Sequence, residues 1–121
     1  MPKTFHPYIP RTVGELSDQL GSMMLSCPKF EDDSGFFPGQ GIGTEFEALG
    51  GGLKNLRPVI GDDRFFRLTE MSQRMRTHFE ADPEDKTDDT LAGRDIIEQM
   101  EEILKKVDDP ADHPNYTGPR G

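Results

Sequence analysis

Four stretches of this chain place apolar residues at the three- and four-residue spacing of a helix, and this periodicity limits the fold more than any other feature. The stretches cover residues 13–27, 44–60, 63–79 and 90–107. No run of four or more residues alternates apolar and polar side chains convincingly, as a half-buried strand would. The sequence therefore predicts an all-α fold, a four-helix domain with antiparallel neighbours.

The first predicted helix has the clearest start and end. Thr12 precedes it and Glu15 follows three residues later, an arrangement in which side chains satisfy the free backbone N–H groups of the first turn. Pro28 ends the helix, since proline cannot continue the hydrogen-bond ladder. Its apolar face contains Val13, Leu16, Leu20, Met23, Met24 and Cys27.

The second predicted helix, which begins near Thr44, contains three consecutive glycines, Gly50 to Gly52. Each glycine costs a helix roughly 1 kcal/mol relative to alanine. We therefore expect either a break near Leu49, a close approach of another helix, or a site where a ligand or partner backbone comes near. Pro58 is placed to break the last turn of the same helix.

The remaining segments define the domain organisation. Residues 28–43 hold two prolines and four glycines, which indicates a long loop after the first helix. We expect a single helical domain over residues 12–107. Residues 1–11 form an extended N-terminal arm and residues 108–121 a flexible C-terminal tail, so both termini are expected to be disordered or extended.

Composition and charge exclude several classes of protein. The chain has 121 residues and a net charge of −9, which disfavours binding to nucleic acid or to anionic lipid. Its apolar runs are too short for a membrane span, and the start does not resemble a signal peptide. The single cysteine, Cys27, cannot form an intramolecular disulfide. We therefore expect a cytoplasmic protein.

The residues with potentially catalytic side chains do not have the spacing and orientation of a catalytic site. Asp95, Glu98, Glu101 and Glu102 have a spacing similar to the ExxE motifs of all-helical nucleotide hydrolases, but they lie opposite the apolar face of their helix. The histidines His6, His78 and His113 are scattered. We therefore expect no enzyme activity, no cofactor and no metal site.

Aromatic residues outside the apolar faces are the best candidates for binding. Phe36 and Phe37 lie in the long loop after Asp32 and Asp33, and Phe66 falls on the polar side of the third helix. Exposed aromatic side chains anchor protein interfaces, and surrounding charge accelerates association. These five residues are the predicted partner-binding site.

The sequence therefore favours a small acidic helical protein that binds or masks a basic protein partner, as an immunity or antitoxin-like protein binds a toxin. Its size, helix count and charge are similar to those of the immunity proteins of DNase bacteriocins. Their adjacent tyrosines have no counterpart, because Tyr8 and Tyr116 are both terminal. The alternatives are an all-helical metal-dependent nucleotide hydrolase that uses its carboxylates, and a homodimeric structural module.

Overall fold

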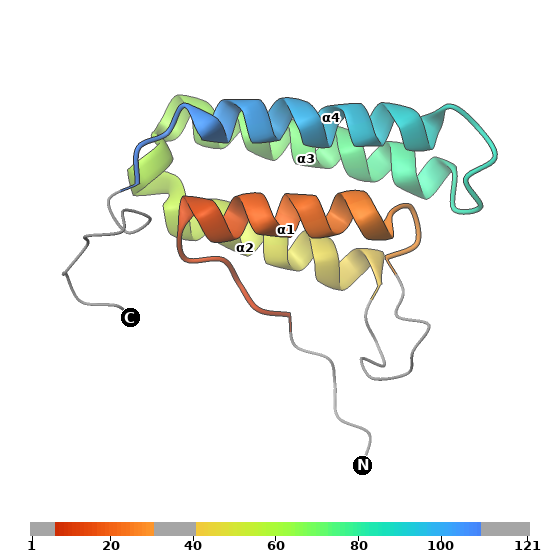
Figure 1. Ribbon diagram of the computed structural model, residues 1–121, viewed down its shortest axis with the longest axis horizontal. Helices are drawn as coiled ribbons and strands as arrows, with labels where there is room; N and C mark the ends of the chain where they lie inside the picture. Colours follow the sequence, from red (N-terminus) through yellow and green to blue (C-terminus); the bar gives the residue numbers. More distant parts are fainter. Residues whose placement is uncertain (1–6, 31–40, 110–121) are drawn as a thin grey trace, which may run out of the picture.

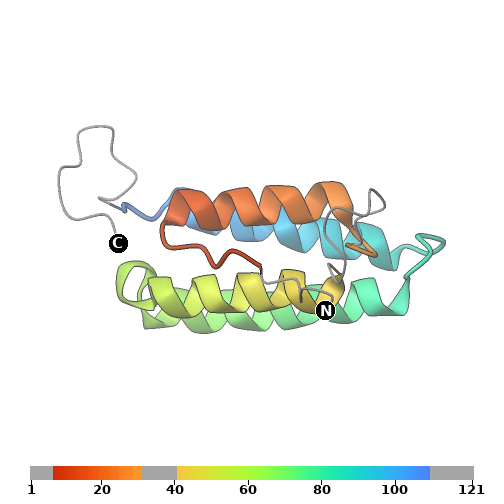
Figure 2. The same cartoon turned by 90° about the horizontal axis from the view of Figure 1, so that it is seen from below.

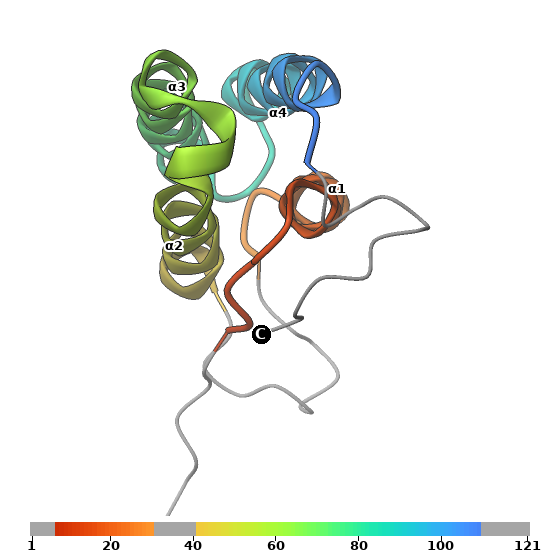
Figure 3. The same ribbon diagram turned by 90° about the vertical axis from the view of Figure 1, so that its left-hand side faces the viewer.

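The computed structural model of the chain describes residues 7–30 and 41–109, which contain four α-helices and no strand. The helices alternate in direction along the bundle (Figure 1). Viewed from one end they occupy the corners of a square, so that each contacts the next in sequence and α4 returns to contact α1 (Figure 3). The predicted all-α, four-helix fold is confirmed. The helices are α1 (Val13–Ser26), α2 (Ile42–Ile60), α3 (Asp62–Ala81) and α4 (Asp89–Lys105).

The start of α1 agrees with the sequence prediction. Thr12 Oγ1 accepts a hydrogen bond of 3.0 Å from the backbone N–H of Glu15. The Glu15 carboxylate accepts one of 2.8 Å from the N–H of Arg11. The start expected for α2 is wrong, since the helix begins at Ile42, two residues before Thr44. The Thr44 hydroxyl instead lies inside the first turn, where it accepts a hydrogen bond from the backbone N–H of Gly41.

The core lies between the four apolar faces. Side chains from every helix contribute to it, and those of Leu20, Leu49, Met75 and Ile97 are each at most 1% exposed. Ser72 and Thr90 are among the few polar residues that are also buried. The periodicity therefore identified the core positions within the helices.

An aromatic cluster joins the helices at one end of the bundle. Phe30, just after α1, contacts the rings of Phe46 and Phe79 edge-on, with centroids 6.0 Å and 5.3 Å apart. On α4, Gly93 lies against the ring of Phe79, and a Cβ atom at this glycine would clash with that ring. The cluster therefore brings together residues of α2, α3 and α4 with the segment that follows α1.

The glycines of α2 do not break the helix, which also continues through Pro58 to Ile60. The segment of residues 7–11 runs between α1 and α2 (Figure 2). A Cβ at Gly51 would lie 2.8 Å from Ile9, and one at Gly52 would lie 3.1 Å from Pro10. The expected close approach is thus real at these two glycines, but much of it comes from the N-terminal arm.

The packed body also extends past Val107, where the sequence placed its end. Asp109 is only 6% exposed, and its Oδ2 accepts a 2.9 Å hydrogen bond from the N–H of Val13 in the first turn of α1. A carboxylate here satisfies a free donor and interacts favourably with the positive end of the helix dipole. Within the described residues, no helix is long and apolar enough to cross a membrane.

The contact between Gly93 and Phe79 predicts opposite effects for two alanine substitutions. Gly93→Ala forces the buried Phe79 ring to move and should lower the free energy of unfolding by about 1–3 kcal/mol. Gly21→Ala in α1, where no atom lies within 4 Å of a new Cβ, should raise it by about 0.5–1 kcal/mol. Urea denaturation of both variants measures this difference, and equal effects would refute the close approach of α3 and α4.

The bond from Asp109 to α1 gives a second prediction. Asp109→Ala leaves the N–H of Val13 without its acceptor and should lower the free energy of unfolding by about 1 kcal/mol, as the loss of a helix cap does. Urea denaturation at neutral pH is the measurement. A variant as stable as the wild type would place the end of the packed body at Val107 after all.

Candidate functional site

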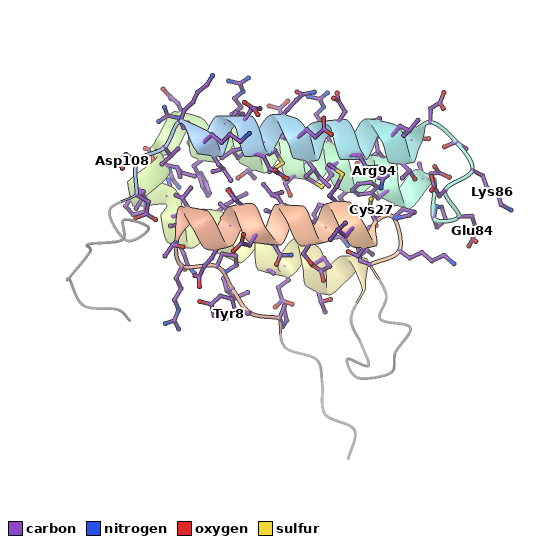
Figure 4. All side chains as sticks on the ribbon, viewed as in Figure 1. Tyr8, Cys27, Glu84, Lys86, Arg94 and Asp108 are labelled. Carbon is purple, nitrogen blue, oxygen red and sulfur yellow. The ribbon has the colours of Figure 1, made fainter. Side chains whose placement is uncertain are left out.

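The loop between α3 and α4 lies at the end of the bundle where α1 and α3 end and α2 and α4 begin, and its Glu84, Asp85 and Asp88 are exposed. We call this end of the bundle the acidic end. Glu84 and Lys86 mark its loop, residues 82–88, in Figure 4. Residues 82–98 contain seven Asp or Glu and two Lys or Arg. Lys29 reaches the loop from the end of α1, with 3.5 Å between its Nζ and the Glu84 carboxylate.

Asp82 holds this loop in place. Its carboxylate accepts hydrogen bonds from the backbone N–H groups of Lys86 and Thr87 and from the Thr90 hydroxyl, at 2.7 Å, 3.2 Å and 2.8 Å. Burial of Asp82 opposes ionisation, but these bonds and one from the N–H of Thr90 outweigh it and lower the pKa from 3.8 to about 2. Asp82 therefore has a structural role, and the loop's other carboxylates remain exposed.

Two leucines are exposed at the same end. Leu25, near the end of α1, is 88% exposed, and Leu91, in the first turns of α4, is 59% exposed. Leu91 lines a shallow hollow between α1 and α4 together with Met24, and the charged side chains of Arg94, Asp95 and Glu98 form the rest of its lining. Apolar side chains with a charged border are typical of protein interaction surfaces.

Cys27 and Arg94 lie between α1 and α4 at this end (Figure 4). Burial raises the pKa of the Cys27 thiol, and the neighbouring Arg94 guanidinium opposes the rise. Cys27 packs against the core, as its position on the apolar face of α1 indicates. His78, on α3, interacts with Asp89 on α4, with 2.9 Å between Nδ1 and Oδ1.

The predicted partner-binding residues divide into two groups. Asp32, Asp33, Phe36 and Phe37 lie outside the described residues, so their role stays a prediction. The residues that border their segment, Phe30 and Gly41, are both at the acidic end, since Phe30 contacts Phe79 near the end of α3 and Gly41 precedes α2.

Phe66 lies near the start of α3, about 20 Å along the helix from Phe79 at a rise of 1.5 Å per residue. It is 59% exposed, as its place on the polar face indicates. The guanidinium of Arg57 lies 4.9 Å from its ring centroid and also bonds Asp62 at 2.8 Å. The structure therefore does not place Phe66 at the acidic end.

The carboxylates of α4 point outward. Asp95, Glu98 and Glu102 are exposed and Glu101 is half-buried. Asp95 accepts a hydrogen bond from Gln99, and Glu102 pairs with Lys105, both at 2.8 Å. Among the residues that the structure describes, no three His, Cys, Asp or Glu side chains are grouped so that they could hold a metal ion.

Sequence reasoning missed Leu25 and Leu91 as candidate binding residues. Both leucines fall outside the apolar faces that the periodicity defines. That position alone could have indicated that their side chains are exposed. Compared with known proteins, the chain matches no family model, no curated protein and no solved structure. Any functional conclusion must therefore come from the chain's own residues.

The hydrogen bonds to Asp82 predict a pH dependence of stability. Because the pKa is about 2 in the folded protein and ordinarily 3.8, the ionised carboxylate stabilises the fold above about pH 4, and this contribution is lost as the pH falls to about 2. Asp82→Asn should melt at a lower temperature than the wild type at pH 7, and the difference should shrink between pH 4 and pH 2. Thermal unfolding followed by circular dichroism tests this; a difference that is constant with pH would exclude a stabilising charge at Asp82.

Proposed function

We propose that this chain is an interaction protein that binds a basic protein partner at its acidic end, as an immunity or antitoxin-like protein masks a toxin. The observation that carries the proposal is the exposure of Leu25 and Leu91 at the end of the bundle with the acidic loop. Full burial of a leucine side chain removes apolar surface from water, a gain of about 1.5–3 kcal/mol before the costs of association, so two such residues can contribute to binding a partner.

The charge at this end supports a basic partner. The excess of carboxylates over basic residues in 82–98 attracts a positive surface and accelerates encounter, an effect screened over about 8 Å at physiological salt. Asp95 and Glu98 line the hollow beside Leu91, together with Arg94. They would form charged contacts at the border of the interface, where charge affects association more than dissociation.

A second copy of this chain is a less favourable partner for the same surface. In a twofold dimer through the acidic end, each copy presents the same patch to the other. The carboxylates of one loop would then face those of its equivalent, and like charges brought together across an interface are destabilising. Charge therefore favours a basic protein over the homodimer.

Affinity capture from the native cells with four matched baits tests this proposal. The wild type should retain a basic protein. A bait with Asp95→Asn and Glu98→Gln should bind the purified partner with slower association and a weaker dependence on salt. A bait with Leu25→Ala and Leu91→Ala should bind it roughly 30-fold or more weakly, the loss expected at anchor residues.

The control bait carries Asp63→Asn and Glu70→Gln, which change the net charge equally on exposed residues in the first half of α3, away from the acidic end. It should bind like the wild type. A captured partner that is acidic, or one whose affinity is unchanged by the leucine substitutions, would contradict the proposal. Circular dichroism of each bait confirms that the fold is retained.

A further inference from the structure

Gly50 differs from its two glycine neighbours in α2. Gly51 and Gly52 allow the N-terminal arm and Leu16 to approach, whereas no atom lies within 4 Å of a Cβ built at Gly50. Glycine weakens a helix relative to alanine. At Gly50 no close contact requires a residue without a side chain, so packing does not explain this glycine. The missing side chain instead contributes to a hollow between α2 and α3.

The hollow has an apolar lining and the size of a small ligand. Phe46 and Leu53 of α2 and Phe65 of α3 contribute its apolar surface, and its volume is about 210 Å³. An apolar cavity of roughly 150 Å³ in another protein holds benzene. The hollow is therefore large enough for one aromatic ring or a short aliphatic chain that carries a polar group.

Cations and hydroxyl groups complete the lining. Lys54 comes from α2 and Arg76 from α3, and the hydroxyls of Thr69 and Ser72 also line the hollow. Within the described residues, Lys54 has no ion pair. Arg76 lies 5.6 Å from the centroid of the Phe46 ring and pairs with an exposed carboxylate, that of Glu80, at 3.5 Å.

The charge inside the hollow is opposite in sign to that of the whole protein. Of the described residues that line it, Lys54 and Arg76 are charged and none is a carboxylate, in a chain whose net charge is −9. Carboxylates accept hydrogen bonds only, and ammonium, guanidinium and hydroxyl groups donate them. We propose that the hollow between α2 and α3 binds a small apolar carboxylic acid, with its ring or chain on Phe46, Leu53 and Phe65 and its carboxylate at Lys54 and Arg76.

The hollow lies between α2 and α3, whereas Leu25 and Leu91 belong to α1 and α4, and the proposal does not depend on the protein partner. The size limits the ligand to one ring or a chain of similar volume. The direct probe is phenylacetate, and phenylacetamide is its neutral analogue of nearly the same shape. Titration of the full-length, ¹⁵N-labelled protein with each compound, followed by NMR, measures both affinities in the same way.

Phenylacetate should shift the amide signals of Gly50, Leu53 and Thr69 and saturate with a Kd of about 1 mM, an ordinary affinity for a ligand of this size. Phenylacetamide should bind at least about tenfold more weakly, since it lacks the charge-assisted hydrogen bonds. Equal binding of both compounds would show an apolar hollow with no preference for acids and would overturn the proposal. Absence of saturable shifts up to ~20 mM phenylacetate would overturn it too.

Two variants in the hollow and one control variant connect the binding to the hollow. Gly50→Ala adds a methyl group into open space, so it should fold, melt at a higher temperature than the wild type, and bind phenylacetate at least about tenfold more weakly. Gly21→Ala in α1 should also raise the melting temperature but leave binding unchanged. Lys54→Gln should weaken phenylacetate about five- to tenfold without affecting phenylacetamide. A Gly50→Ala variant that binds like the wild type would overturn the proposed site.

Discussion

The ring of Phe79 determines how closely the four helices approach at the acidic end. It lies against the backbone of α4 at Gly93 and contacts Phe30, which in turn contacts Phe46 of α2. The chain is only 32% hydrophobic, so a few large side chains must fill the space between its helices. Through these contacts the cluster joins Phe30, just after α1, to the first turns of α2 and α4 at the acidic end.

Much of the fold could be predicted because it depends on local sequence. Apolar spacing identified the four helices, and Thr12 with Glu15 identified the start of α1. The structure corrects what depends on contacts between distant residues. Phe30 is in a stretch with no helical period, yet it is buried because α2 and α3 supply its neighbours. Asp109 likewise follows the last periodic residue, and its partner Val13 lies 96 positions away.

The candidate site was harder to predict for a related reason. A sequence shows that Phe66 falls outside an apolar face, but it does not show which end of the bundle holds which residues. Alternation of helix direction brings Leu25 and Leu91, far apart in the sequence, to one end, and leaves Phe66 near the other. The net charge of −9 also concealed the basic lining of the hollow between α2 and α3. The glycines of α2 illustrate the same limit, since three consecutive glycines have three different environments.

The central claim is that the acidic end is the surface by which this protein binds a basic partner. Its most direct test is an NMR titration of the ¹⁵N-labelled chain with the purified basic protein recovered by capture. If the partner binds at the acidic end, the largest changes in amide chemical shift and line width should occur at Leu25, Leu91, Asp95 and Glu98. The amides around Phe66 should change little. Changes confined to the α2–α3 face around Phe66 would contradict the claim.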